Sequence, residues 1–273
     1  MRYLNFSFAV ILSSTLLLSC GNKQSQAKEE IEYDKSDTTL VVYYDQGYNA
    51  GYSDGTASVL VMKSFEDILR ESQEGNMKSQ YSLGRCYLDG NHVKQSDIKA
   101  VEWFRKSADQ GFAMAQQELG LCYYEGKGGL KQSYDEAIKW YRKSAEQGYS
   151  YAEHCMGVVY ERGEGVPQNY AEAAKWYSLA AEKGNPVSQV NLALLYEDGN
   201  GVEKDIEKAY QLLMKSANNG FVGGLRYLAD YYRQGIYVQQ DINQAIELYI
   251  QAANQGDEYS AEWLNELGVK ENQ

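Results

Sequence analysis

Proline and histidine are nearly absent from this sequence, with 2 residues of each among 273. Because proline removes a backbone donor and interrupts helices, its scarcity leaves almost every segment free to run as a helix. Neither histidine has Cys or His residues at the spacing of a zinc site. We therefore expect a helical protein without a bound metal or other cofactor.

Basic residues are also in deficit. The chain has 26 Lys and Arg against 38 Asp and Glu, which gives a formal net charge of -12 at pH 7. Phosphate backbones would repel such a protein, so nucleic acid is excluded as a partner, and direct adsorption to an anionic membrane is disfavoured. No Ser-His-Asp arrangement, phosphate-binding glycine loop or isolated carboxylate pair stands out, so the sequence predicts no catalytic residues.

No hydrophobic run is long enough to span a bilayer comfortably. The longest, from Phe6 to Leu18, has 13 residues and suits the hydrophobic region of an export signal. The residues Leu17-Leu18-Ser19-Cys20-Gly21 that end it resemble the lipobox of bacterial lipoproteins. This resemblance implies a signal peptide over 1–19, lipidation of Cys20 and attachment to the cell envelope, with the outer membrane expected. The alternative is an ordinary secretory signal with a chance cysteine.

The residues from 20 to 38 are polar and lack an apolar period, so we expect a disordered tether. Its expected role is to hold the rest of the chain away from the membrane, facing the periplasm or the cell surface.

Beyond the tether, glycines recur at nearly constant spacing. The intervals between them are 36, 37, 36, 36 and 36 residues, and the glycines are Gly75, Gly111, Gly148, Gly184, Gly220 and Gly256. Most intervals repeat Leu-Gly-x-x-Tyr-x-x-Gly or a close relative, then a short loop and an Ala-x-x-Trp-Tyr-x-x-Ser-Ala-x-x-Gly segment. A fixed period of this size indicates a stack of helical hairpins rather than one globular core.

Each repeat contains two amphipathic segments. In the second repeat, Ala115, Leu119 and Tyr123 recur at helical spacing. They predict the first helix of that repeat, helix A, which stops near Gly126. Helix B follows, with Trp140 on its apolar face. Small residues shared by the repeats predict helix crossings at Gly84, Gly120 and Gly157, with the Trp and Tyr residues as core. The cysteines after position 20 are expected to be buried thiols, and only Cys122 and Cys155 are placed for a disulfide.

These motifs carry a family resemblance. Leu83-Gly84-Arg85-Cys86-Tyr87-Leu88-Asp89-Gly90 and the segment from Ala100 to Gly111 resemble a Sel1-like repeat, a relative of the tetratricopeptide repeat. The resemblance implies an all-α protein, an α-solenoid of stacked antiparallel hairpins wound as a right-handed superhelix, with five repeats over 76–256. It also implies an adaptor or binding scaffold rather than an enzyme.

Both ends of the array look capped. Tyr52-Ser53-Asp54-Gly55 resembles Tyr87-Leu88-Asp89-Gly90, so 39–75 is expected to be a degenerate repeat or a capping helix. Residues 257–273 repeat the start of helix A and then stop, so they are expected to form a C-terminal capping helix.

Candidate binding residues are those that vary while the rest of helix A stays constant. They fall at three positions on one face, which lines the concave groove in tetratricopeptide-like arrays, and we expect this face to be exposed. The first variable position holds Tyr81, Gln117, His154, Val190 and Arg226; the second holds Arg85, Leu121, Val158, Leu194 and Asp230; and the third holds Leu88, Tyr124, Glu161, Glu197 and Arg233.

The sequence therefore predicts a lipid-anchored scaffold that binds a peptide or protein partner in this groove. Two alternatives stay open. One is an enzyme acting on cell-wall material, although some Sel1-like proteins described as β-lactamase-like have regular cysteine pairs that this chain lacks. The other is a structural envelope scaffold that binds through the outer face of the B helices.

Overall fold

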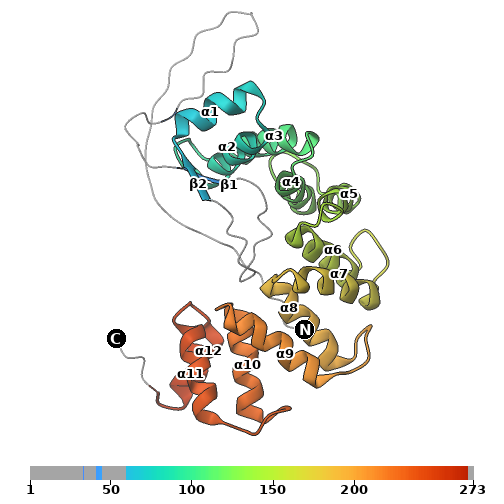
Figure 1. Ribbon diagram of the computed structural model, residues 1–273, viewed down its shortest axis with the longest axis vertical. Helices are drawn as coiled ribbons and strands as arrows, with labels where there is room; N and C mark the ends of the chain where they lie inside the picture. The colour runs from blue at the N-terminus through green and yellow to red at the C-terminus, as the bar shows by residue number, and fades with distance from the viewer. Residues whose placement is uncertain (1–32, 34–40, 45–59, 270–273) are drawn as a thin grey trace, which may run out of the picture. The chain divides into compact units, whose positions relative to one another are not determined.

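The computed structural model describes residue 33 and residues 41–44 and 60–269, which fall into two compact units divided after Ser133. These residues contain twelve helices and one two-stranded antiparallel sheet (Figure 1). The predicted signal peptide, the lipidation site Cys20 and nearly all of the tether lie outside the described residues.

The first unit contains β1 (Val41–Tyr44), β2 (Leu60–Lys63), α1 (Phe65–Glu74), α2 (Met77–Asp89), α3 (Asp97–Asp109) and α4 (Ala113–Glu125). The second unit contains α5 (Tyr134–Ala145), α6 (Ser150–Arg162), α7 (Tyr170–Glu182), α8 (Pro186–Asp198), α9 (Ile206–Asn218), α10 (Val222–Gln234), α11 (Ile242–Ala253) and α12 (Glu258–Glu266).

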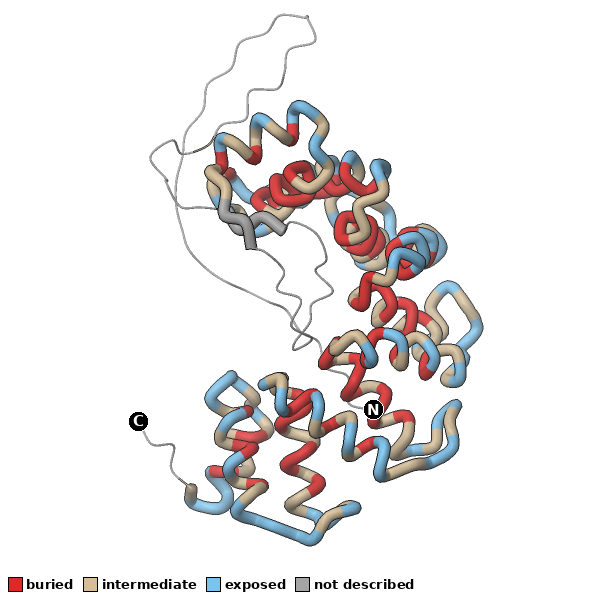
Figure 2. Tube along the Cα trace, viewed as in Figure 1, coloured by how far each residue is buried: buried red, intermediate tan, exposed pale blue. Residues whose placement is uncertain are grey.

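The helices alternate as the repeat predicts. Even-numbered helices are the A helices and odd-numbered helices are the B helices, and α2 packs on α3, α6 on α7, α8 on α9 and α10 on α11. Buried residues gather where these helices face their neighbours (Figure 2). The all-α repeat solenoid expected from the sequence is confirmed.

Local residues set the helix ends. Helix α4 stops at Glu125 because Gly126 adopts a left-handed conformation, with φ of 72°, and its N–H bonds back to the carbonyl of Cys122. At the start of α9, the Asp205 side chain accepts from the backbone N–H of Lys208 and satisfies a donor that the helix itself leaves unpaired.

Glycines on the A helices mark the predicted crossings. A Cβ added at Gly84 would lie 2.6 Å from the ring of Phe104, and one added at Gly157 would lie 2.4 Å from the ring of Tyr177. The ring at each crossing therefore belongs to the residue after the repeat's tryptophan. The expectation that the tryptophans are core residues is wrong for Trp103, which is only half-buried, with the Nζ of Lys106 3.7 Å from its ring centroid.

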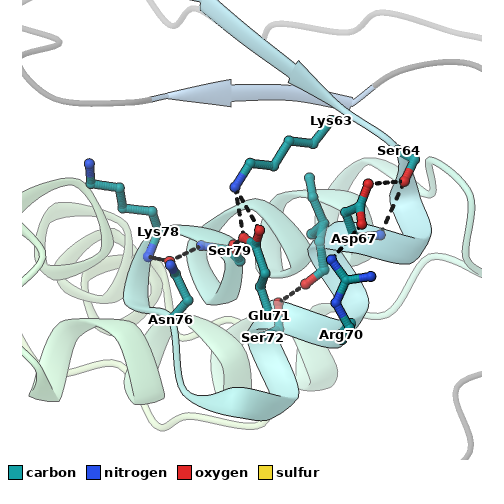
Figure 3. Close-up of polar contacts among 10 residues, drawn as sticks. Lys63, Ser64, Asp67, Arg70, Glu71, Ser72, Asn76, Lys78 and Ser79 are labelled. Atoms are coloured by element: carbon teal, nitrogen blue, oxygen red, sulfur yellow. Dashed lines mark hydrogen bonds and ion pairs between the residues drawn. The ribbon is translucent and has the colours of Figure 1, made fainter.

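The N-terminal end differs from a degenerate helical repeat. Strands β1 and β2 pair antiparallel, with Val41 opposite Lys63, so the helical part described within 39–75 is α1 alone. The Lys63 ammonium at the end of β2 donates to Glu71 of α1, which also accepts from the Ser79 hydroxyl of α2 (Figure 3). Burial opposes ionisation of Glu71, yet these two hydrogen bonds hold its pKa below the usual value. The strand end, α1 and α2 are thus joined by one carboxylate.

Candidate functional site

Residues at the first variable position lie mainly in the interior. Val190 is 1% exposed, Tyr81 4% and Gln117 9%. The expectation that this position offers an exposed surface is therefore wrong. The physical reason is that the side chains point towards the following hairpin: the Tyr81 ring lies 5.4 Å from that of Phe112, the residue that precedes α4.

The polar members of this position join successive A helices. His154 Nδ1 on α6 lies 3.0 Å from the Ser188 hydroxyl on α8, and Arg226 on α10 pairs with Asp257 at the start of α12. Burial lowers the pKa of His154 to about 4, so its imidazole is neutral at physiological pH. The Nδ1 atom of His154 is thus occupied within the fold.

The second variable position leaves aliphatic side chains partly accessible. Leu121 on α4 in the first unit is half-buried, as are Val158 on α6 and Leu194 on α8 in the second. Val158 and Leu194 occupy equivalent places on helices that the bond between His154 and Ser188 ties together. We call Val158 and Leu194 the apolar row of the second unit; each also packs by part of its surface against a buried core cluster.

The third variable position places carboxylates beside this row. Glu161 accepts a 2.5 Å hydrogen bond from the Tyr177 hydroxyl, and Glu197 accepts one of 2.9 Å from the Tyr231 hydroxyl. Burial, followed by the nearby carboxylate, raises the pKa of each tyrosine, so the hydroxyls remain donors. Both glutamates are half-buried, and their positions are set by neutral partners that do not cancel their charge.

In the last repeat, the charged residues at the second and third variable positions bond to each other and to a neighbouring tyrosine. Arg233 pairs with Asp230 at 2.6 Å, and the Tyr249 hydroxyl donates to Asp230 at 2.8 Å. Arg233 Nε also donates to the Tyr249 hydroxyl at 3.1 Å, while its guanidinium lies 6.0 Å from the ring centroid of Trp263. This network satisfies both charged residues before any ligand is present.

In the first unit the same face is held by an ion pair. Arg85 lies 3.2 Å from both Asp89 on its own helix and Glu118 on α4. Burial raises the pKa of Glu118 above its ordinary value even though Arg85 opposes the shift. Leu88 and Tyr124, which complete this unit's part of the predicted set, are half-buried.

Metal ligands and cysteine thiols are the remaining candidates for chemistry among the described residues. They contain no group of three or more His, Cys, Asp or Glu side chains arranged to hold a metal ion. Burial raises the pKa of the Cys86 and Cys122 thiols to about 12 each, which makes both poor nucleophiles at neutral pH. Cys122 is a free thiol, so the disulfide with Cys155 that the spacing left open does not form.

None of the helices in the described part of the chain combines the length and apolar character needed to cross a membrane.

Comparison with known proteins matches this architecture. The family model described as "Sel1 repeat" matches five segments, 78–112, 113–149, 150–185, 186–221 and 223–257. A Sel1 repeat protein from Oxalobacter formigenes is 35% identical with a TM-score of 0.68, and the match covers 74% of this chain and 84% of that one. The protein c5321, a protective antigen present in uropathogenic Escherichia coli strains, is 38% identical with a TM-score of 0.64.

The match to c5321 covers 76% of this chain but 45% of the other, so this chain spans less than half of that relative's length. The immunity protein Pa5087 from Pseudomonas aeruginosa shares the fold at 21% identity, with a TM-score of 0.50 and 68% of each chain covered. Sel1-repeat proteins are typically scaffolds for protein–protein interaction and are generally non-catalytic.

Proposed function

The chain belongs to the Sel1-repeat family, and from this membership we propose that it is a membrane-anchored scaffold that binds a peptide or protein partner along its A helices. The observation that carries the proposal is the second variable position, where Leu121, Val158 and Leu194 stay half-buried. Accessible aliphatic side chains at one repeat position favour a binding surface over a purely solvated one.

The spacing on this face suits an extended peptide. Val158 and Glu161 lie three residues apart on α6, as Leu194 and Glu197 do on α8, so each helix presents an apolar contact beside a carboxylate. Packed helices are about 8–10 Å apart, and an extended chain rises about 3.3 Å per residue. About every third residue of such a peptide would therefore reach the next A helix.

The anchor in this proposal is Cys20. The residues Leu17-Leu18-Ser19-Cys20-Gly21 support lipidation, and the polar stretch over 20–38 supports a spacer between the membrane and the repeats. We place the protein at the bacterial cell envelope, attached to the outer membrane.

Loss of the apolar contacts should remove partner binding. We expect the double substitution Leu121→Gln and Leu194→Gln to abolish capture of the native partner from solubilised envelope membranes. The bound partner would cover two side-chain amides that have no matching hydrogen bonds, and their desolvation would oppose binding. Glutamine adds no charge and is similar in size to leucine, so the fold should persist. Crosslinked pull-down with quantitative mass spectrometry measures the effect, and thermal unfolding checks the fold.

The matched control is Lys139→Gln with Lys175→Gln, on the B helices α5 and α7, where these side chains are 64% and 69% exposed. This control should capture the partner as the wild-type protein does. Retention of the partner by the groove variant together with its loss from the B-helix variant would assign binding to the opposite face.

Removal of the lipidation site should release the protein. We expect Cys20→Ala to abolish incorporation of labelled palmitate and to leave the chain either soluble or uncleaved. Envelope fractionation and intact mass measure both effects. A variant that is fully cleaved and still fractionates with membranes would contradict the anchor.

A further inference from the structure

The A helices of the second unit carry an excess of carboxylates that its B helices lack. Helices α6, α8, α10 and α12 contain eight acidic and three basic residues, whereas α5, α7, α9 and α11 contain six of each. Only Glu153 among the eight is buried, where it pairs with Lys183. The charge difference between the A helices and the B helices of this unit therefore comes from residues that solvent reaches at least in part.

The acidic residues continue the variable positions of the groove. The 36-residue period carries the first and second variable positions from Arg226 and Asp230 on α10 to Glu262 and Glu266 on α12. Both of these glutamates are exposed. At the other end of the same unit, Glu161 and Glu197 flank the apolar row.

Two of the three basic residues of these A helices are already paired with carboxylates. Arg226 is 15% exposed and paired with Asp257, and Arg233 is paired with Asp230. Arg162 at the end of α6 is the third basic residue and is exposed. Glu161 and Glu197 accept hydrogen bonds from neutral tyrosines and keep their charge available to a ligand.

We propose that the A-helix face of the second unit binds a cationic segment, an extended peptide rich in Lys or Arg with aliphatic residues that contact Val158 and Leu194. The inference rests on the proposed function and adds the chemistry of the partner. A carboxylate-lined face attracts a basic peptide over distance and disfavours an acidic one, so the charges set selectivity while the aliphatic contacts add burial.

Four labelled nine-residue peptides test the proposal by fluorescence anisotropy with the full chain. Three repeat Lys-Lys-Leu, Ser-Ser-Leu or Glu-Glu-Leu, and the fourth repeats Lys-Lys-Ser. We expect the Lys-Lys-Leu peptide to bind at least tenfold more tightly than any other, and its affinity to fall as salt is raised from about 50 to 500 mM because screening weakens accessible charges.

The variants are designed to separate charge from burial. Neutralising Glu161, Glu197, Glu262 and Glu266 to glutamine should weaken the Lys-Lys-Leu peptide at least tenfold. Neutralising the same number of B-helix carboxylates should have no effect; that control is Glu136→Gln, Glu172→Gln, Glu207→Gln and Glu247→Gln. Thermal unfolding confirms that both variants are folded.

The outcomes distinguish the two proposals. Equal binding of the Ser-Ser-Leu and Lys-Lys-Leu peptides, preference for the Glu-Glu-Leu peptide, or no effect of the A-helix neutralisation would overturn the cationic partner. If the cationic partner were overturned but Leu121→Gln with Leu194→Gln still removed the native partner, binding in the groove would stand and only the cationic character of the partner would be wrong. Absence of binding by all four peptides would also count against the cationic partner.

Discussion

Replacing Lys183 with glutamine should destabilise the second unit by on the order of 3 kcal/mol, because a buried carboxylate then loses its counter-charge. Glu153 on α6 is 3% exposed and pairs with the Lys183 ammonium, which also donates to the carbonyl of Gly148 at 3.0 Å. The second oxygen of Glu153 has no hydrogen-bond partner in the described structure. Urea denaturation at neutral pH, followed by circular dichroism, measures the loss.

The repeat itself supplies the control for this pair. In the first repeat, Gln80 and Gln110 occupy the equivalent places, and Gln110 donates its amide to Gln80 at 2.7 Å. Glu153→Gln with Lys183→Gln should therefore return the stability close to wild type, because it rebuilds an uncharged pair that the fold already uses. Stability losses that simply add in the double variant would show that the two residues do not interact.

The repeat architecture could be predicted because its signals are local and recur. Glycine spacing predicted the period, and the break at Gly126 predicted the end of α4, since a left-handed residue there depends only on the neighbouring turn. The crossings at Gly84 and Gly157 followed from the need for short side chains where helices meet.

Burial at the first variable position could not be predicted in the same way. Whether Val190 faces solvent or the next hairpin depends on how successive hairpins are rotated, which one repeat does not encode. The strands were missed for a different reason. Val41-Val42-Tyr43-Tyr44 has the β-branched and aromatic residues of a strand, but alignment to the repeat favoured a helix.

The serine of the repeated Ser-Ala pair forms a hydrogen bond that the sequence did not predict. A serine recurs in the Ser-Ala pair of the second helical segment, where its small size alone would suit a helix crossing. In the structure the Ser107 hydroxyl donates to the carbonyl of Met77 at 2.6 Å, and Ser216 donates to Pro186 at 3.0 Å. Each bond joins a B helix to the first residue of the A helix in its own repeat, which explains why a hydroxyl recurs at that position.

Gly157→Val should destabilise the second unit by about 3 kcal/mol, at the upper end of the range for overpacked cores. The added Cβ would lie 2.4 Å from the Tyr177 ring, which is fully buried and anchored through its hydroxyl to Glu161. The ring therefore cannot move aside without losing a hydrogen bond and disturbing α7. Thermal and urea unfolding measure the effect.

The next repeat shows which change should relieve this strain. Ala193 and Leu213 occupy the equivalent places there and are both fully buried in one core cluster. Gly157→Ala should consequently cost less than the valine, and adding Tyr177→Leu should recover most of the loss, because leucine removes the ring atoms that meet the new methyl group. An unchanged melting temperature for Gly157→Val would show that α6 and α7 do not cross at this glycine. If Tyr177→Leu restores the stability of the Gly157→Ala variant, the loss of stability comes from the contact between residues 157 and 177.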